Sequence, residues 1–191
     1  MEISLSVLKD LADAIGSAGD AVAKIADGIK HLVVTGVEGY DATKDRISRL
    51  RILDASVRAT RLSISQIAMH DELESFVIRQ EQQDDQDRTA EWQAVLDATD
   101  PVLEEVLTLV DCLDKERSDF VLEPAYVQLR ESLAARQRLL AELRRMPPPA
   151  SPEEVRLARK VSERYDVLIR EVRRARDEMN TYIKSLKAPK A

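Results

Sequence analysis

Few side chains in this 191-residue chain belong to the types that bind metals. It contains one cysteine and two histidines, which is too few for a cysteine-rich zinc site or a multi-histidine centre. A di-iron helical bundle needs Glu-x-x-His motifs on two helices, and neither His31 nor His70 belongs to such a motif. His70 and Glu74 could share a helical face, but a single pair is more typical of a solvated surface. The sequence therefore predicts no metal-binding residue.

Nucleophilic and phosphate-binding chemistry also lacks a recognisable pattern. Cys112 follows Leu109 and Val110, a setting typical of a small buried hydrophobic residue. No local motif supplies the base that a nucleophilic thiol requires. Neither G-x-x-x-x-G-K-S/T nor a G-x-G-x-x-G after a strand occurs. We therefore predict no catalytic residue, no cofactor-binding residue and no small-molecule substrate, and we expect the protein not to be an enzyme.

The composition favours an all-α fold. Hydrophobic residues make up 44% of the chain and can form a core, whereas aromatic residues make up only 4%, which disfavours a β-sandwich or barrel. All five glycines precede residue 40, and the seven prolines fall later in the chain. Because glycine and proline interrupt helices, these positions divide the chain into long helical segments.

The helix boundaries follow from these interruptions and from capping residues. Gly36 ends a first helix, and three consecutive prolines at 147–149 end the helix before them, since proline lacks an amide donor. Ser151, Pro152 and Glu154 fit a capping box that starts the last helix. Residues 80–88 fit either a loop or a helix end. The predicted organisation is a helical bundle over 1–146 with helices at about 5–34, 42–79, 89–115 and 124–145, then a proline-rich linker at 147–151 and a long helix within 152–191.

Apolar residues recur along these helices at alternating spacings of three and four, which predicts seams between long helices packed side by side. The last helix keeps this pattern from Ala158 to Leu186, and the helix before it has one interruption, at Arg136. A helix of 30 residues is about 45 Å long. We therefore predict an all-α, elongated four- to five-helix bundle with coiled-coil-like packing.

The first helix allows two interpretations. Beside its apolar stripe it carries small residues, including Gly16 and Gly19, and a narrow polar face. These features fit a helix at the centre of a bundle, where small residues permit close approach. They also fit an amphipathic helix that leaves the bundle for a membrane, although such helices usually have a basic polar face. The residues of this core or membrane-active stripe are Leu8, Leu11, Ile15, Val22, Ile25 and Ile29.

Charge is divided unevenly along the chain, whose net charge is −6. Residues 71–120 carry sixteen acidic and four basic residues, whereas the last forty residues carry seven acidic and eleven basic ones. Lys44, Arg51 and Arg58 recur every seven residues, and their face either neutralises the acidic segment or contacts an acidic partner or anionic lipid. Trp92 lies in a short amphipathic stretch with Val95 and Leu96, which favours an anchor against the bundle, whereas an exposed Trp92 would add an aromatic contact to this candidate interaction surface. The acidic balance and the lack of interleaved aromatic residues disfavour nucleic acid as a partner.

These features predict a non-enzymatic protein-interaction domain with an adaptor, regulatory or assembly role. It would act through a protein partner or self-association and would use no cofactor. The alternative is a membrane-perturbing bundle that acts through residues 5–34. The chain has no run of 18 apolar residues, and its first ten residues lack the basic and apolar regions of a secretory signal. We therefore expect a cytoplasmic protein, which in the alternative would associate with membranes upon activation.

Overall fold

The computed structural model describes residues 2–35, 73, 76, 85–98 and 123–187. Every regular element within these ranges is an α-helix, and no strand occurs among them. The part of the chain that the structure describes is therefore all-helical, as the composition predicts.

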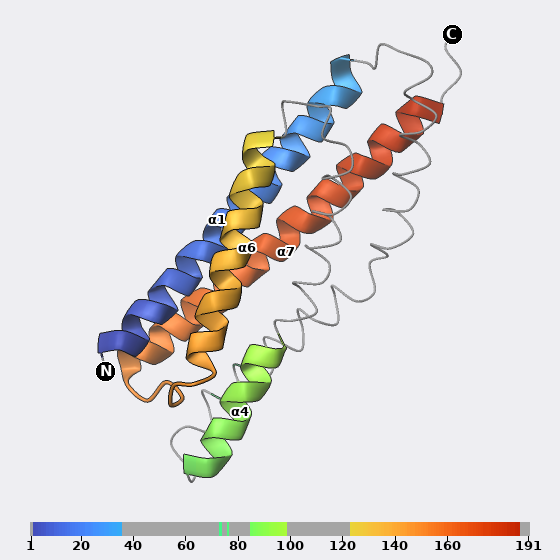
Figure 1. The fold of residues 1–191 in the computed structure, drawn as a ribbon. Helices are drawn as coiled ribbons and strands as arrows, with labels where there is room; N and C mark the ends of the chain where they lie inside the picture. Colours follow the sequence, from blue (N-terminus) through green and yellow to red (C-terminus); the bar gives the residue numbers. More distant parts are fainter. Residues whose placement is uncertain (1, 36–72, 74–75, 77–84, 99–122, 188–191) are drawn as a thin grey trace.

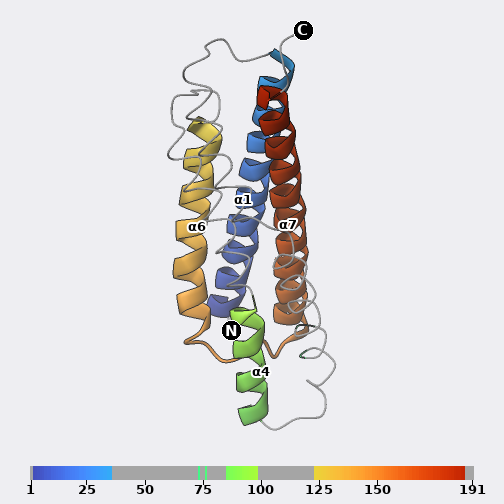
Figure 2. The same ribbon diagram turned by 90° about the vertical axis from the view of Figure 1, so that its right-hand side faces the viewer.

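Four helices make up this part, and three of them form an elongated group. α1, α6 and α7 lie side by side, with α6 antiparallel to the other two (Figure 1). α1 packs along both α6 and α7, and Figure 2 shows it between them. The short α4 lies at the end of the group where α1 begins. The bounds of the helices are Glu2–Thr35 for α1, Asp85–Asp97 for α4, Glu123–Leu143 for α6 and Pro152–Lys187 for α7.

α1 lies at the centre because apolar and small residues cover the sides that face its two neighbours. Each of the six stripe residues is at most 1% exposed, and Ala12, Ala21 and Ala26 are fully buried. Full burial of one leucine, isoleucine or valine side chain stabilises a fold by about 1.5–3 kcal/mol. The stripe is therefore a core surface in this structure. Its members are Leu8, Leu11, Ile15, Val22, Ile25 and Ile29.

α6 and α7 turn their own apolar stripes toward α1. On α7 the buried residues include Tyr165, Leu168 and Val172, and on α6 they include Leu129 and Leu133. These positions follow the alternating spacing of three and four that the sequence shows. The facing stripes form one hydrophobic core that continues into the contact with α4.

Several boundaries differ from those expected from the sequence. α4 begins at Asp85 rather than near residue 89, because acidic residues in a first helical turn interact favourably with the helix dipole. α6 ends at Leu143, and the following turn tightens, with the Arg145 amide donating to the carbonyl of residue 142 and the Met146 amide to that of residue 143.

Two predicted helices fall largely outside the described residues. Of the predicted helix at 42–79, only Leu73 and Phe76 are described, and both are helical and buried. Of the predicted helix at 89–115, residues 99–115 also lie outside the described residues. The helix count of four to five and the coiled-coil-like packing therefore stay predictions.

Gly16 and Gly19 lie on the side of α1 that contacts α7. A Cβ atom added at Gly19 would lie 3.7 Å from the backbone of Leu168, and one added at Gly16 would lie 3.5 Å from the side chain of Arg164. Both distances are ordinary van der Waals contacts. Close approach therefore favours small residues at these positions, but it leaves room for alanine.

We predict that Gly19→Ala stabilises the protein. Alanine restricts the unfolded backbone and favours the helix by about 1 kcal/mol relative to glycine, and the added methyl group fits against Leu168. Urea unfolding should show a higher midpoint with an unchanged slope. The larger Gly19→Leu serves as the control and should be destabilising, because the backbone of Leu168 cannot move aside as a flexible side chain can. A lower midpoint for Gly19→Ala would contradict the packing described.

We also predict that Ile25→Asp abolishes cooperative unfolding. Ile25 is fully buried, and an unpaired charge in an apolar core costs several kcal/mol out of a total domain stability of about 5–15 kcal/mol. Thermal melting followed by circular dichroism measures the effect. Asp20→Asn, on the exposed side of the same helix, should melt like the unmodified protein. A cooperative transition for Ile25→Asp near the original temperature would show that the fold does not depend on α1.

Candidate functional site at one end of the bundle

Polar and aromatic side chains gather where α1 begins, α6 ends, α7 begins and α4 docks. This end contains the turn between α6 and α7, a buried arginine–tyrosine pair and a small cavity beside α4.

A capping box starts α7, as the sequence predicts. The amide of Glu154 donates to Ser151 Oγ at 3.2 Å, and the amide of Ser151 donates back to Glu154 Oε2 at 2.8 Å. The amide of Ala150 also donates to Glu154 Oε2, at 3.0 Å. The other carboxylate oxygen accepts a hydrogen bond from Ser4 Oγ. Glu154 therefore caps α7 and ties it to the first turn of α1, a link that local sequence patterns do not reveal.

These hydrogen bonds hold Glu154 in its ionised form. Burial by itself raises the pKa of this carboxyl group, but hydrogen bonds from Ser4, Ser151 and Ala150 together outweigh it and lower the pKa from 4.5 to about 2. The residue as a whole is 7% exposed, so solvent screens these interactions only weakly. The charged state of Glu154 therefore stabilises the folded protein.

We predict that Glu154→Gln reduces the acid sensitivity of folding. A group whose pKa is lower in the folded state stabilises the protein fully above its unfolded pKa, near 4.5, and loses this contribution as pH falls toward 2. The loss is at most about 3 kcal/mol. Urea unfolding across this pH window should show a shallower dependence for Glu154→Gln than for the unmodified chain.

Glu153→Gln provides the matched control. The Glu153 side chain is 61% exposed and pairs with Arg156 at 3.6 Å, a type of surface contact that contributes little to stability. This variant should keep the pH dependence of the unmodified protein. Equal slopes for all three proteins would show that Glu154 is not held as described.

Arg136 interrupts the apolar stripe of α6 and is 2% exposed. Its Nε donates to the hydroxyl oxygen of Tyr165 on α7 at 2.5 Å, and the guanidinium carbon lies 5.6 Å from the centre of the Tyr165 ring. A buried arginine requires such partners because an uncompensated charge is costly in the core. The pair therefore joins α6 to α7. The sequence gives one signal for it, since both residues occupy core positions and each carries a polar group that needs a partner.

A second polar cluster joins α1 to α6 farther from this end. The Ser132 hydroxyl lies 2.8 Å from the Gln128 carbonyl oxygen and 2.9 Å from the Ser17 hydroxyl. Gln128 Nε2 donates to the Ser17 carbonyl oxygen at 3.1 Å, and Lys24 Nζ donates to Gln128 Oε1 at 2.8 Å. These directional bonds fix the register of the two helices.

α4 docks through Trp92, which is 3% exposed, and through Val95 and Leu96. The Trp92 and Phe76 ring centres are 5.4 Å apart, with the rings tilted by 41°. An ion pair of 3.0 Å between Arg144 and Asp97 links α4 to the turn after α6. Trp92 is therefore a buried anchor of α4, one of the two roles that its short amphipathic stretch allows, and its indole ring is not exposed for contact with a partner. Its short apolar stretch packs against the bundle, and that packing covers the indole ring.

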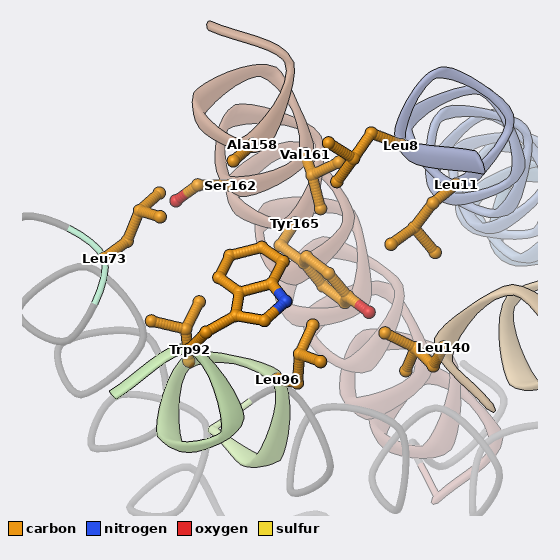
Figure 3. A pocket seen from close by; sticks show the side chains of 11 residues that line it. Leu8, Leu11, Leu73, Trp92, Leu96, Leu140, Ala158, Val161, Ser162 and Tyr165 are labelled. Carbon is orange, nitrogen blue, oxygen red and sulfur yellow. The ribbon is translucent and has the colours of Figure 1, made fainter. Parts of the chain in front are cut away.

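A cavity of about 20 Å³ lies beside Trp92 (Figure 3). Its walls come from all four described helices, and the lining residues include Leu8, Leu96, Leu140, Ser162 and Tyr165. Pockets that bind drug-sized ligands are about 300–1,000 Å³, so the cavity as it stands has no room for a substrate of that size. The polar groups at its walls are hydroxyls and an indole N–H, which are hydrogen-bonding groups rather than metal ligands or a nucleophile with its base.

The described ranges hold no cluster of three His, Cys, Asp or Glu side chains able to bind a metal ion. None of the helices in those ranges combines the length and the apolar character needed to cross a membrane. Lys44, Arg51 and Arg58 lie outside the described residues, so the proposed basic face has no structural description here. The same is true of Cys112 and of the pair His70 and Glu74.

No protein-family model matches the chain, and no curated protein or solved structure matches it. A function for this chain therefore rests on its own residues and their geometry.

Proposed function

We propose that the protein is a non-enzymatic helical scaffold that binds an acidic surface of a partner protein through the outer face of α7. The observation that carries this proposal is the way polar and charged side chains are distributed around α7. Its buried polar residues Glu154 and Ser162 face other helices, whereas Arg156, Arg159 and Arg170 project into solvent.

The outer face of α7 has the geometry of an extended contact surface. Arg159 and Arg170 are eleven residues apart, so they share one side of the helix at a separation of roughly 16 Å. Both are exposed. The last forty residues carry an excess of basic side chains in an acidic protein. Such a face attracts an acidic partner and speeds its association, with a strong dependence on salt.

The buried polar contacts and the small cavity are more typical of a rigid binding scaffold than of a catalytic site. The buried polar groups serve as inter-helix locks, such as Ser4 to Glu154 and Arg136 to Tyr165. The cavity is smaller than a substrate pocket. Nucleic acid is the weaker candidate for this face because Glu163 and Asp166 interrupt the basic residues. Tyr165, the aromatic side chain that the structure describes on α7, is buried and cannot stack on a base.

Membrane perturbation through residues 5–34 is the alternative, and no observation in the structure favours it. The apolar stripe of α1 is buried against α6 and α7. Release of α1 would expose that stripe and those of both neighbours at once. The scaffold proposal needs no such rearrangement. The proposal includes a complete bundle of four to five helices with coiled-coil-like packing. The periodicity of apolar residues in the sequence supports this part of it.

We predict that Arg159→Glu combined with Arg170→Glu weakens partner binding without unfolding the protein. The intact chain and the variant would each be used for affinity purification from the native host at low and moderate salt. A partner of the proposed kind should be recovered with the intact chain, be retained less as salt rises, and be lost or reduced at least tenfold with the variant.

The matched control is Arg138→Glu on α6 combined with Arg145→Glu in the turn after it, which makes the same charge change at exposed positions. This control should retain the partner. Equal loss from both variants would indicate a general charge effect, and recovery unaffected by the α7 variant would overturn the proposed surface. Light scattering of the purified chain separates self-association from a different partner, since a monomer has a mass of 21.5 kDa.

A further inference from the structure

α4 contributes far less to the hydrophobic core than α1 does. It buries three apolar side chains, those of Trp92, Val95 and Leu96, whereas the described part of α1 buries eleven apolar residues. The free energy needed to separate packed elements rises with the apolar surface that becomes exposed. Removing α4 from its docked position therefore costs less than separating α1 from α6 and α7.

The contact between α4 and the other three described helices is incompletely packed. The cavity of about 20 Å³ lies in this contact, and its walls are almost entirely apolar. Figure 3 shows Trp92 and Leu96 of α4 facing Tyr165 and Leu140 across it. Side chains around an empty space lose attractive contacts on that side, so the docked position of α4 is held less tightly than a filled interface would be.

Two buried polar groups beside the cavity also make the docked position costly. Trp92 Nε1 and Ser162 Oγ have no hydrogen-bond partner in the part of the chain that the structure describes. The two residues are 3% and 5% exposed, and a buried polar group without a partner lowers stability. Each group would be hydrated if α4 moved away, which offsets part of the apolar surface exposed by that movement.

The polar contacts of α4 with the turn after α6 lie on the surface. Arg144 and Asp97 form an ion pair of 3.0 Å in which the side chains are 38% and 64% exposed, and Gln93 Nε2 donates to the Arg144 carbonyl oxygen at 3.3 Å. Surface ion pairs contribute little to stability. By contrast, a partly buried hydrogen bond from Ser4 to Glu154 joins α1 to α7.

We propose that α4 is a detachable cover, which opens as a unit while α1, α6 and α7 stay folded together. Opening exposes the apolar walls of the cavity, including Leu8 on α1, Leu140 on α6 and Val161 on α7. The protein thus has a closed form, in which this apolar surface is covered, and an open form, in which the surface is accessible at the end of the bundle where α1 begins.

Hydrogen exchange of the full chain, followed by NMR at a series of low urea concentrations, tests the proposal. The chain has a single tryptophan, and its indole proton reports the uncovering of the ring because it takes no part in the backbone bonds that fray at a helix end. We expect its protection factor to be at least about tenfold lower than those of the Ala21 and Val22 amides in α1. Its dependence on urea should be measurable but shallower than theirs, since opening exposes less surface than global unfolding.

Two variants separate opening of α4 from global unfolding, and circular dichroism establishes that each keeps its helical fold. Ile25→Val weakens the core shared by the closed and open forms. It should lower the protection of the α1 amides by about two- to tenfold and leave the indole proton unchanged. Leu96→Ala weakens the docking of α4 and should lower the protection of the indole proton by at least about tenfold.

The result that would overturn the proposal is a loss of indole protection in Ile25→Val equal to that of the α1 amides, since α4 would then leave only when the whole protein unfolds. Indole exchange that responds neither to urea nor to Leu96→Ala would also overturn it, because the proton would then exchange without undocking of the helix.

Discussion

The burial of one apolar stripe on α1 is the constraint on which the rest of the described structure depends. The stripe residues are at most 1% exposed, and they achieve this because α6 and α7 flank the same helix from two sides. A helix with apolar residues on two sides cannot bury all of them against a single neighbouring helix. The arrangement of α6 and α7 around α1 follows from that requirement.

Apolar contacts hold the helices together but do not by themselves choose the register between them, since neighbouring registers bury similar areas. Directional polar contacts make that choice. Glu154 connects the starts of α1 and α7, Arg136 connects α6 to Tyr165 on α7, and the Ser17 cluster connects α1 to α6. Each pair of long helices is therefore joined by its own buried or partly buried polar contact. Such buried polar contacts favour one packing arrangement over its competitors.

Local patterns in the sequence predict the features that depend on neighbouring residues. The alternating spacing of apolar residues identifies the buried stripe of α1, and the order Ser151, Pro152, Glu154 identifies the capping box. Local patterns do not predict contacts between residues that are distant in the sequence. Ser4 and Glu154 are 150 residues apart, and nothing in the sequence near either one indicates the other. For the same reason the sequence leaves open whether Trp92 is buried or exposed, because its burial depends on Phe76 and on α7 rather than on its own helix.

The order of the helices along the chain affects how the protein folds during synthesis. α1 ends at Thr35, whereas its partner α6 begins at Glu123 and α7 at Pro152. At a translation rate of about 5–20 residues per second, several seconds pass between the synthesis of α1 and the synthesis of α6 or α7. Contacts that join such distant segments also slow folding, because a long loop must close first. The nascent chain therefore exposes this stripe before α6 and α7 can cover it, and the packing of α1 against these two helices is a late step of folding.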